Sequence, residues 1–335
     1  MIARAEPARA APAEALYPLA GKRVWVAGHR GMVGSAVVRR LAAEGCEVRT
    51  AGREQVDLTR QAEVEDWMAE AKPQAVVVAA AKVGGILAND TWPADFIGQN
   101  LAIQSNVIDT ARRIGVEKLL FLGSSCIYPK LAPQPISEDA LLTGPLEPTN
   151  EWYAIAKIAG IKLCQAHRRQ FGCDFISAMP TNLYGLGDNF DLESSHVGAA
   201  LMVKAHRAKL EGRPSIEIWG TGTPRRELLF VDDLADACVH LLRQYSDEAH
   251  VNVGTGQDAT IDEIARTIAR VVGFEGEFTY DRSKPDGTPR KLLDVSRMTA
   301  GGWTASTTLE EGMRRTYQWY LENVACTGPG RLNPS

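Results

Sequence analysis

The sequence predicts a doubly wound α/β fold: a parallel Rossmann-type sheet with helices on both faces, followed by a smaller C-terminal α/β substrate lobe. Short apolar runs alternate with segments of helical apolar spacing through the first half of the chain. One run, residues 75–81, is apolar throughout, as expected for a strand buried on both faces. A glycine-rich turn separates the first expected strand from the first expected helix.

This first turn has the pattern G-x-x-G-x-x-G. It follows an expected strand over residues 22–28 and precedes an expected helix over 35–44, with Gly45 as the helix C-cap. Glycines at this spacing permit a sharp turn, close backbone approach to a pyrophosphate, and packing of the helix on the strand. An ordinary loop is the alternative. The expected cofactor contacts here are Gly28, His29, Arg30, Gly31, Met32, Val33 and Gly34.

The end of the second strand, expected over residues 46–51, indicates which dinucleotide is bound. NAD sites usually place an acidic side chain at this point, whereas this chain has Arg53. Arg53 could pair with a 2′-phosphate, and Arg30 could join it, which favours NADP(H) over NAD. The alternative is that both arginines are merely solvated. Asp57 and Leu58 are expected to contact the adenine.

The following strands are expected over residues 118–122 and 174–179, with a helix over 100–114. In a parallel sheet the loops after such strands meet at the carboxyl edge, where ligands bind. The loop after residue 122 carries Ser124 to this edge.

Tyr153 and Lys157 are four residues apart in an expected helix, so they share one face. An ammonium beside a phenol favours the phenolate, which would let Tyr153 exchange a proton near neutral pH. The hydroxyl of Ser124 could bind the same substrate oxygen. Together the three suit proton transfer to a carbonyl while a cofactor supplies hydride. The alternative is a surface helix with a common spacing.

After residue 185 the alternation loosens, as expected where a smaller lobe is inserted. Further strands are expected over residues 228–231 and 250–253, and helices over 197–211, 232–242, 260–272 and 308–323. The cofactor domain is therefore expected to comprise residues 21–185, rejoined by about 227–256. The smaller substrate lobe would comprise residues 186–226 and 257–325.

Composition excludes several classes of protein. The 335 residues are 45% apolar and 23% charged with a net charge of −4, which argues against a nucleic-acid or polybasic membrane surface. The six cysteines show no metal-site spacing, so no metal is expected, and reduced thiols indicate a cytoplasmic protein. Residues 1–20, rich in Ala, Pro, Arg and Glu, are expected to be a disordered extension, with structure starting near Gly21.

Several long motifs carry a resemblance to a known family. Residues 28–35, 79–86, 123–130 and 153–159 resemble the extended short-chain dehydrogenase/reductase superfamily and, within it, the GDP-L-fucose synthase family. The similarity runs from about residue 22 to 323. It implies that GDP-4-keto-6-deoxy-D-mannose is epimerised at C3 and C5 and then reduced at C4 by NADPH to GDP-L-fucose. It also implies a homodimer, through helices such as 100–114 and 150–171.

The resemblance also assigns roles to individual residues. Ser124, Tyr153 and Lys157 would serve reduction, and Cys126 and His196 would move the C3 and C5 protons. The nicotinamide side of the cofactor would be bordered by Lys157, Pro180, Thr181, Asn182, Leu183 and His196. The nucleotide sugar would be held by Lys204, Trp219, Arg226, Asp286 and Lys291.

Alternatives remain open at each step. Taken alone, Cys126 could be a small buried hydrophobe, His196 a residue that caps a helix, and Trp219 a core residue. The nearest rival function is a sugar-nucleotide 4-epimerase or 4,6-dehydratase. Dehydratases of the superfamily carry an Asp-Glu pair where this chain has Ser125-Cys126, and Arg53 argues against tightly held NAD. An NADP-binding regulator without activity is the rival from another class.

Overall fold

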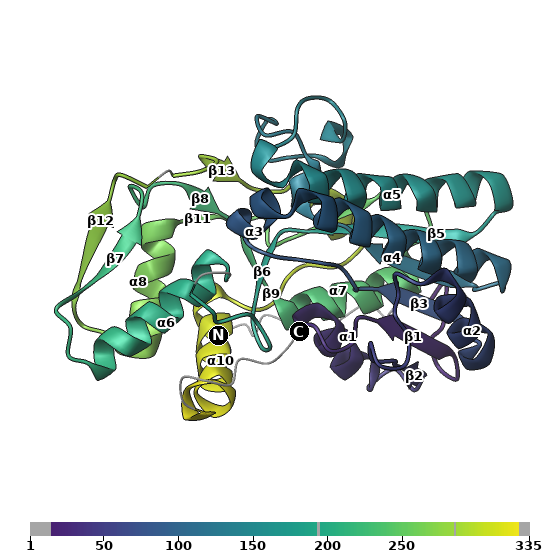
Figure 1. Ribbon diagram of the computed structural model, residues 1–335, viewed down its shortest axis with the longest axis horizontal. Coiled ribbons are helices and arrows are strands. Elements are labelled where there is room, and N and C mark those ends of the chain that lie inside the picture. The colour runs from purple at the N-terminus through teal and green to yellow at the C-terminus, as the bar shows by residue number, and fades with distance from the viewer. Residues whose placement is uncertain (1–14, 193–194, 285, 328–335) are drawn as a thin grey trace, which may run out of the picture.

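The computed structural model describes residues 15–192, 195–284 and 286–327. A six-stranded sheet, parallel throughout, occupies one half of the molecule in the order β10-β5-β4-β3-β1-β2 (Figure 1). Its strands are β1 (Arg23–Ala27), β2 (Glu47–Arg49), β3 (Ala75–Val78), β4 (Lys118–Leu122), β5 (Asp174–Pro180) and β10 (Val251–Val253). The predicted doubly wound fold is confirmed.

Helices cover both faces of this sheet (Figure 1). Helices α1 (Met32–Leu41) and α7 (Val231–Gln244) lie on one face, and α2 (Gln61–Ala71), α4 (Pro93–Arg113) and α5 (Glu151–Phe171) lie on the other. The short helix α3 (Ile86–Thr91) leads into α4. Each face has its own apolar core, because central strands such as β3 and β4 are buried on both sides.

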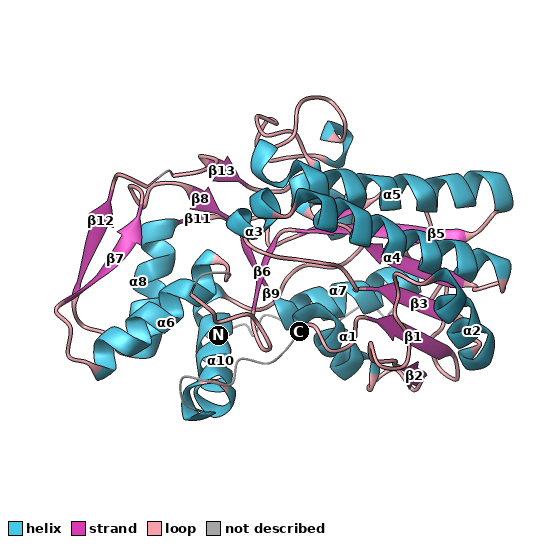
Figure 2. Cartoon of the chain, in the orientation of Figure 1, coloured by secondary structure: helices cyan, strands magenta, loops and turns pink. Residues whose placement is uncertain are grey.

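The second lobe lies beyond the carboxyl end of the sheet (Figure 2). Its helices are α6 (Val197–Leu210), α8 (Ile261–Val272) and α10 (Leu309–Asn323), which share a third core. Small sheets join β7 (Ser215–Trp219) to β12 (Glu277–Asp281), β6 (Asn182–Tyr184) to β9 (Leu228–Phe230), and β8 (Arg225–Arg226) to both β11 (Ala259–Thr260) and β13 (Arg290–Lys291). Helix α9 (Ser296–Ala300) packs beside β10. The division into two domains stays a prediction.

Helix boundaries are where sequence and structure differ most. Helix α1 begins at Met32 rather than at residue 35, and its C-cap is Ala42, not Gly45. Helix α4 begins at Pro93 rather than at residue 100, with proline in its first turn. Thr260 and Thr308 are the N-caps of α8 and α10, and Thr260 forms a capping box with Glu263.

The start of the described chain corrects a further expectation. Of the extension expected to be disordered, residues 1–14 lie outside the described residues, but 15–20 pack on the sheet domain. Leu19 is 2% exposed within the core, and the hydroxyl of Tyr17 donates to Glu117 at 2.9 Å. Ordered structure therefore begins before Gly21, because Leu19 contributes an apolar side chain to the core.

Candidate active site

The catalytic loop leaves β4 at the carboxyl edge of the sheet. Gly123 passes so close to β5 that a Cβ there would lie 2.3 Å from the sulfur of Met179. Ser124 caps a single 3₁₀ turn, Ser125–Ile127, and its Oγ accepts from the Cys126 N–H at 3.5 Å. Cys126 is 8% exposed. The turn thus presents a hydroxyl and a thiol from one short segment.

Helix α5 supplies the other two predicted groups. The Nζ of Lys157, a residue only 4% exposed, donates to the carbonyl of Leu122 at 2.8 Å, which ties the helix to the end of β4. The same Nζ lies 5.7 Å from the ring centroid of Tyr153. Both residues interact electrostatically with Cys126. The structure therefore brings Ser124, Cys126, Tyr153 and Lys157 together.

The protonation of Tyr153 differs from the expectation of a phenolate near neutral pH. Burial raises the pKa of Tyr153, and the charge of Cys126 raises it further. Lys157 does not offset this, because its ammonium donates to the Leu122 carbonyl and not to the phenol. Tyr153 thus keeps its proton at neutral pH, which suits a proton donor rather than a base.

The charge of Lys157 predicts a pH dependence for reduction. Burial lowers its pKa to about 8, so the ammonium predominates below that pH and is lost above it. We expect the reduction rate to fall by about tenfold per pH unit above the pKa of Lys157. Single-turnover loss of NADPH absorbance, followed from neutral to alkaline pH, measures this; a flat rate through that range would contradict it.

The glycine motif fits a dinucleotide. Gly28 has φ +88°, and a Cβ there would lie 2.6 Å from the backbone nitrogen of Ala80. A Cβ on Gly34 would lie 2.1 Å from the carbonyl oxygen of Gly28. Gly31 caps α1 with no side-chain hydrogen bond, and the first turn has no acidic residue. The N–H groups at this helix start therefore face no anionic side chain of their own turn, as a pyrophosphate site requires.

The two arginines expected at the 2′-phosphate are arranged differently. Arg30 forms a bidentate ion pair with Glu54, at 2.5 and 2.8 Å. Arg53 is exposed and has no hydrogen-bond or ion-pair partner in the part of the chain described. Asp57, expected at the adenine, accepts hydrogen bonds from Thr59, which lower the pKa of its carboxyl. Arg53 is thus the available cation, and the roles of these residues stay predictions.

The segment expected beside the nicotinamide follows β5. Pro180 ends that strand, and Thr181 donates its N–H to Val253 at 3.0 Å. Asn182 donates to the carbonyl of Glu227 at 3.0 Å, and Leu183 follows it in β6. A few residues on, the chain passes over the start of α1, where a Cβ on Gly187 would lie 3.7 Å from the Cα of Met32. The segment therefore adjoins the glycine motif.

His196 lies at the start of α6. It is the N-cap residue, but its side chain makes no capping hydrogen bond, so capping does not explain the imidazole. The residue is exposed, yet the neighbouring chain desolvates the ring enough to lower its pKa, which favours the neutral imidazole. No hydrogen bond joins it to Ser124, Cys126 or Tyr153 within the described residues.

The five residues expected at the nucleotide sugar form one patch of the second lobe. The indole of Trp219 is 61% exposed, so a core role is excluded, and the Nζ of Lys204 lies 5.3 Å from its ring centroid. Asp286 accepts from the N–H of Thr221 at 2.7 Å. Arg226 donates to the carbonyl of Thr288 at 2.6 Å, and Lys291 pairs with Arg226 in the strand register. The loop before β13 is thus fastened over β7 and β8.

Two buried polar groups escaped the sequence analysis. Tyr128 bonds to both His250, at 3.0 Å, and Asn252, at 2.5 Å, although His250 had no expected role. Glu227 is 0% exposed and follows two arginines, a charged run that is typical of surface. Glu227 lies between β8 and β9, where the sequence shows no alternation of polar and apolar residues, so no local pattern signalled its burial.

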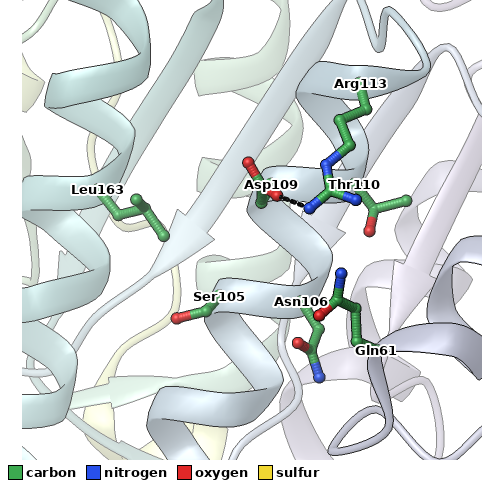
Figure 3. Close-up of a pocket in the computed structure, with 7 residues that line it drawn as sticks. All are labelled: Gln61, Ser105, Asn106, Asp109, Thr110, Arg113 and Leu163. Atoms are coloured by element: carbon green, nitrogen blue, oxygen red, sulfur yellow. Dashed lines mark hydrogen bonds and ion pairs between the residues drawn. The ribbon is translucent and has the colours of Figure 1, made fainter.

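A separate cavity of about 260 Å³ lies away from these groups, between α2, α4 and α5 (Figure 3). The cavity lies along the second half of α4, near the edge of the sheet at which β4 begins. Its lining residues are Gln61, Ser105, Asn106, Asp109, Thr110, Arg113 and Leu163. It is therefore not the reaction site.

Among the described residues, no three His, Cys, Asp or Glu side chains are placed to hold a metal ion. None of the described helices has the length and apolar character needed to cross a membrane.

Comparison with known proteins now decides the family. The model of the NAD dependent epimerase/dehydratase family matches residues 24–254. GDP-L-fucose synthase of Sinorhizobium fredii is 62% identical over 92% of this chain and 99% of that relative. The chain belongs to the GDP-L-fucose synthase family.

Other members of the GDP-L-fucose synthase family agree with this assignment. GDP-L-fucose synthase 1 of Arabidopsis thaliana is 60% identical over 90% of the chain and 94% of that protein. A crystal structure of a GDP-L-fucose synthetase from Naegleria fowleri bound to NADP has a TM-score of 0.85 at 26% identity, covering 94% of this chain and 98% of that one. The similarity thus spans both lobes.

Proposed function

We propose that this chain converts GDP-4-keto-6-deoxy-D-mannose to GDP-L-fucose, by epimerisation at C3 and C5 followed by NADPH-dependent reduction at C4. The observation that carries the proposal is the Cys126 thiol, which lies within the cluster of Ser124, Tyr153 and Lys157. Those three residues suit reduction of a carbonyl. A thiol among them adds a group that can move a proton on carbon.

Epimerisation uses the acidity of the carbons beside the C4 ketone. When Cys126 as thiolate removes a proton, the C–H bond breaks, an S–H bond forms, and the electron pair moves to the ketone oxygen as an enolate. Inversion requires protonation on the opposite face of the sugar. His196 is the second acid–base group: desolvation lowers its pKa and favours the neutral ring, which takes a proton from solvent and passes it to the carbon.

Reduction uses the remaining three groups. NADPH, when bound, supplies hydride to C4. Tyr153 gives its proton to the C4 oxygen, and Ser124 orients that oxygen by a hydrogen bond. Lys157 places its positive charge 5.7 Å from the centre of the phenol ring, where it stabilises the phenolate that forms once the proton has passed to the C4 oxygen. The glycine turn holds the pyrophosphate, and Arg53 pairs with the 2′-phosphate.

Binding of the GDP group falls to the patch on the second lobe. Trp219 offers an exposed aromatic face to the base, while Lys204 and Arg226 offer cations to the diphosphate. Asp286 already bonds to Thr221, so it holds the loop over the patch. Lys291 lies next to Arg226 in the strand register and interacts electrostatically with Cys126.

Turnover in deuterated water tests the function. Given GDP-4-keto-6-deoxy-D-mannose and NADPH, we expect NADPH oxidation and deuterium at C3 and C5 of the fucosyl product, measured by proton NMR. Product without solvent label would refute epimerisation. A 4-epimerase or 4,6-dehydratase would not oxidise NADPH stoichiometrically, and a regulator without activity would bind NADPH without product.

Assembly and location complete the proposal. A homodimer through α4 and α5 is supported by the side-by-side position of these helices (Figure 1) and by Trp152 and Ile155, which are 39% and 40% exposed on α5. Sedimentation equilibrium at twice the chain mass would support it. The free cysteines are compatible with a cytoplasmic location.

A further inference from the structure

The side chain of Lys291, near Cys126, has no carboxylate partner among the described residues. This lysine is the last residue of β13, which pairs in parallel with β8 so that Lys291 lies opposite Arg226. Its side chain is partly buried and makes no hydrogen bond or ion pair with the residues that the structure describes. Lys157, in contrast, donates to the Leu122 carbonyl. The charge of Lys291 is therefore available to another group.

The backbone around Lys291 is fastened to the chain that follows the catalytic loop. Leu292, the next residue, donates its N–H to the side chain of Gln134 at 2.9 Å, and its carbonyl accepts from Ile136 at 2.8 Å. Asn252, which is 0% exposed, donates to the carbonyls of Ile136 and Asp294. Tyr128, which follows the turn that carries Cys126, donates to the Oδ1 of Asn252 at 2.5 Å, so Asn252 joins that turn to the segment that carries Lys291.

Glu227 holds the same segment from the other side. Its N–H donates to the carbonyl of Lys291 at 3.2 Å, and its carboxylate accepts from the N–H of Leu293 at 3.0 Å and of Gly256 at 2.8 Å. The Glu227 carboxylate is packed tightly against the backbone, because a Cβ on Gly254 would lie 2.3 Å from it. A buried carboxylate is costly unless its hydrogen bonds are made, and here they are.

The groups that affect the Cys126 thiol come from three parts of the chain. Burial raises the pKa of the thiol, and Lys291 is foremost among the groups that oppose this rise, followed by Ser124 on the same loop and Lys157 on α5. Tyr153, also on α5, is neutral near pH 7. Burial lowers the pKa of Lys291, Cys126 opposes this, and of the further charges Arg226 disfavours the ammonium while Glu147, which also pairs with Lys130 at 3.0 Å, favours it.

We propose that Lys291 is a positioning residue that acts on Cys126 through its charge, as the counter-ion of the thiolate that removes the sugar proton, and that Glu227 holds it in place. This rests on the proposed function and adds to the substrate contact expected of Lys291. Lys291 exchanges no proton in the step: the C–H bond breaks, the S–H bond forms, and the ammonium changes only how much thiolate is present.

Alkylation of Cys126 by iodoacetamide tests the proposal without turnover, since only the thiolate reacts. The rate at Cys126 is followed against pH by peptide mass spectrometry in the full chain without substrate. We expect Lys291→Met to move the pH profile of Cys126 upward and to slow alkylation about tenfold for each unit of pKa. Lys291→Arg, which keeps the charge, should restore most of the rate.

Controls separate this effect from misfolding. The exposed Cys326 serves as an internal reference whose alkylation should not change. Lys284→Met removes a lysine at the start of the same loop, beside Trp219, and should leave the Cys126 profile unchanged. Glu227→Gln should shift it in the same direction as Lys291→Met.

One outcome would overturn the proposal. If Lys291→Met leaves the Cys126 profile unmoved but raises the KM for the GDP-sugar, Lys291 is a substrate ligand only. Failure of the proposed function is distinguishable, because it would be seen as absent product with the wild-type chain, whereas the alkylation profile requires no reaction.

Discussion

Replacement of Cys126 by serine is expected to stop the exchange of the C3 and C5 protons with solvent while leaving NADPH binding intact. Serine is close to cysteine in size and can occupy the same position within the 3₁₀ turn. A serine hydroxyl, however, is a far weaker acid than a thiol and supplies no useful base near neutral pH. Loss of a general base lowers the rate by about 10²–10⁴-fold. Deuterium incorporation, measured by NMR, would show it.

The same variant should still reduce the ketone, because Ser124, Tyr153 and Lys157 remain. We therefore expect slow formation of a C4-reduced sugar that has not been inverted. Cys164→Ser is the matched control, since it removes a thiol that is 1% exposed on α5 and lies outside the cluster. If Cys126→Ser exchanges as fast as the wild-type chain, the thiol is only a packing group.

Much of the fold was predictable from local pattern. Strands of a parallel sheet are buried on both faces, so β3 is a continuous apolar run and β4 and β5 are mostly apolar, apart from Lys118, Asp174 and Ser177. The glycine motif was visible because each glycine has a steric reason, such as the 2.1 Å approach of a Cβ on Gly34 to Gly28. The start of α4 was missed although Pro93 marks a first helical turn, since the apolar spacing becomes regular only later.

The candidate site was predictable in its members but not in its contacts. Ser124, Tyr153 and Lys157 stand at recognisable spacings, whereas the direction in which Lys157 donates depends on how α5 packs against β4. The protonation of Tyr153 also depends on packing. The neighbouring lysine predicts a phenolate, but burial of the phenol has the larger effect on its pKa and raises it.

Residues far apart in sequence set the remaining part of the site. Glu227, Asn252 and Lys291 are joined by hydrogen bonds between three segments that no local pattern connects. From the sequence pattern alone, a glutamate that follows two arginines is expected to be exposed to solvent. Its burial arises only because the N–H groups of Gly256 and Leu293 converge on it.

Replacement of Tyr153 by phenylalanine should produce the opposite result from the Cys126 variant. The ring can keep its edge-to-face contact with Phe96, at 6.5 Å between centroids, so the helix start is expected to stay in place. What is lost is the hydroxyl that protonates the C4 oxygen. Removal of a general acid lowers the rate by about 10²–10⁴-fold, here the rate of NADPH oxidation.

Exchange of the C3 and C5 protons should continue in that variant, because Cys126 and Lys291 are untouched and Ser124 still binds the ketone oxygen. Tyr317→Phe, which removes a phenol hydroxyl bonded to His206 in the other lobe, is the control and should alter neither rate. If Tyr153→Phe abolishes exchange as well as reduction, Tyr153 also stabilises the enolate, and the two stages share a catalytic group. If only reduction is lost, one pocket holds two separable sets of residues, with the thiol for carbon acidity and the phenol for the alcohol.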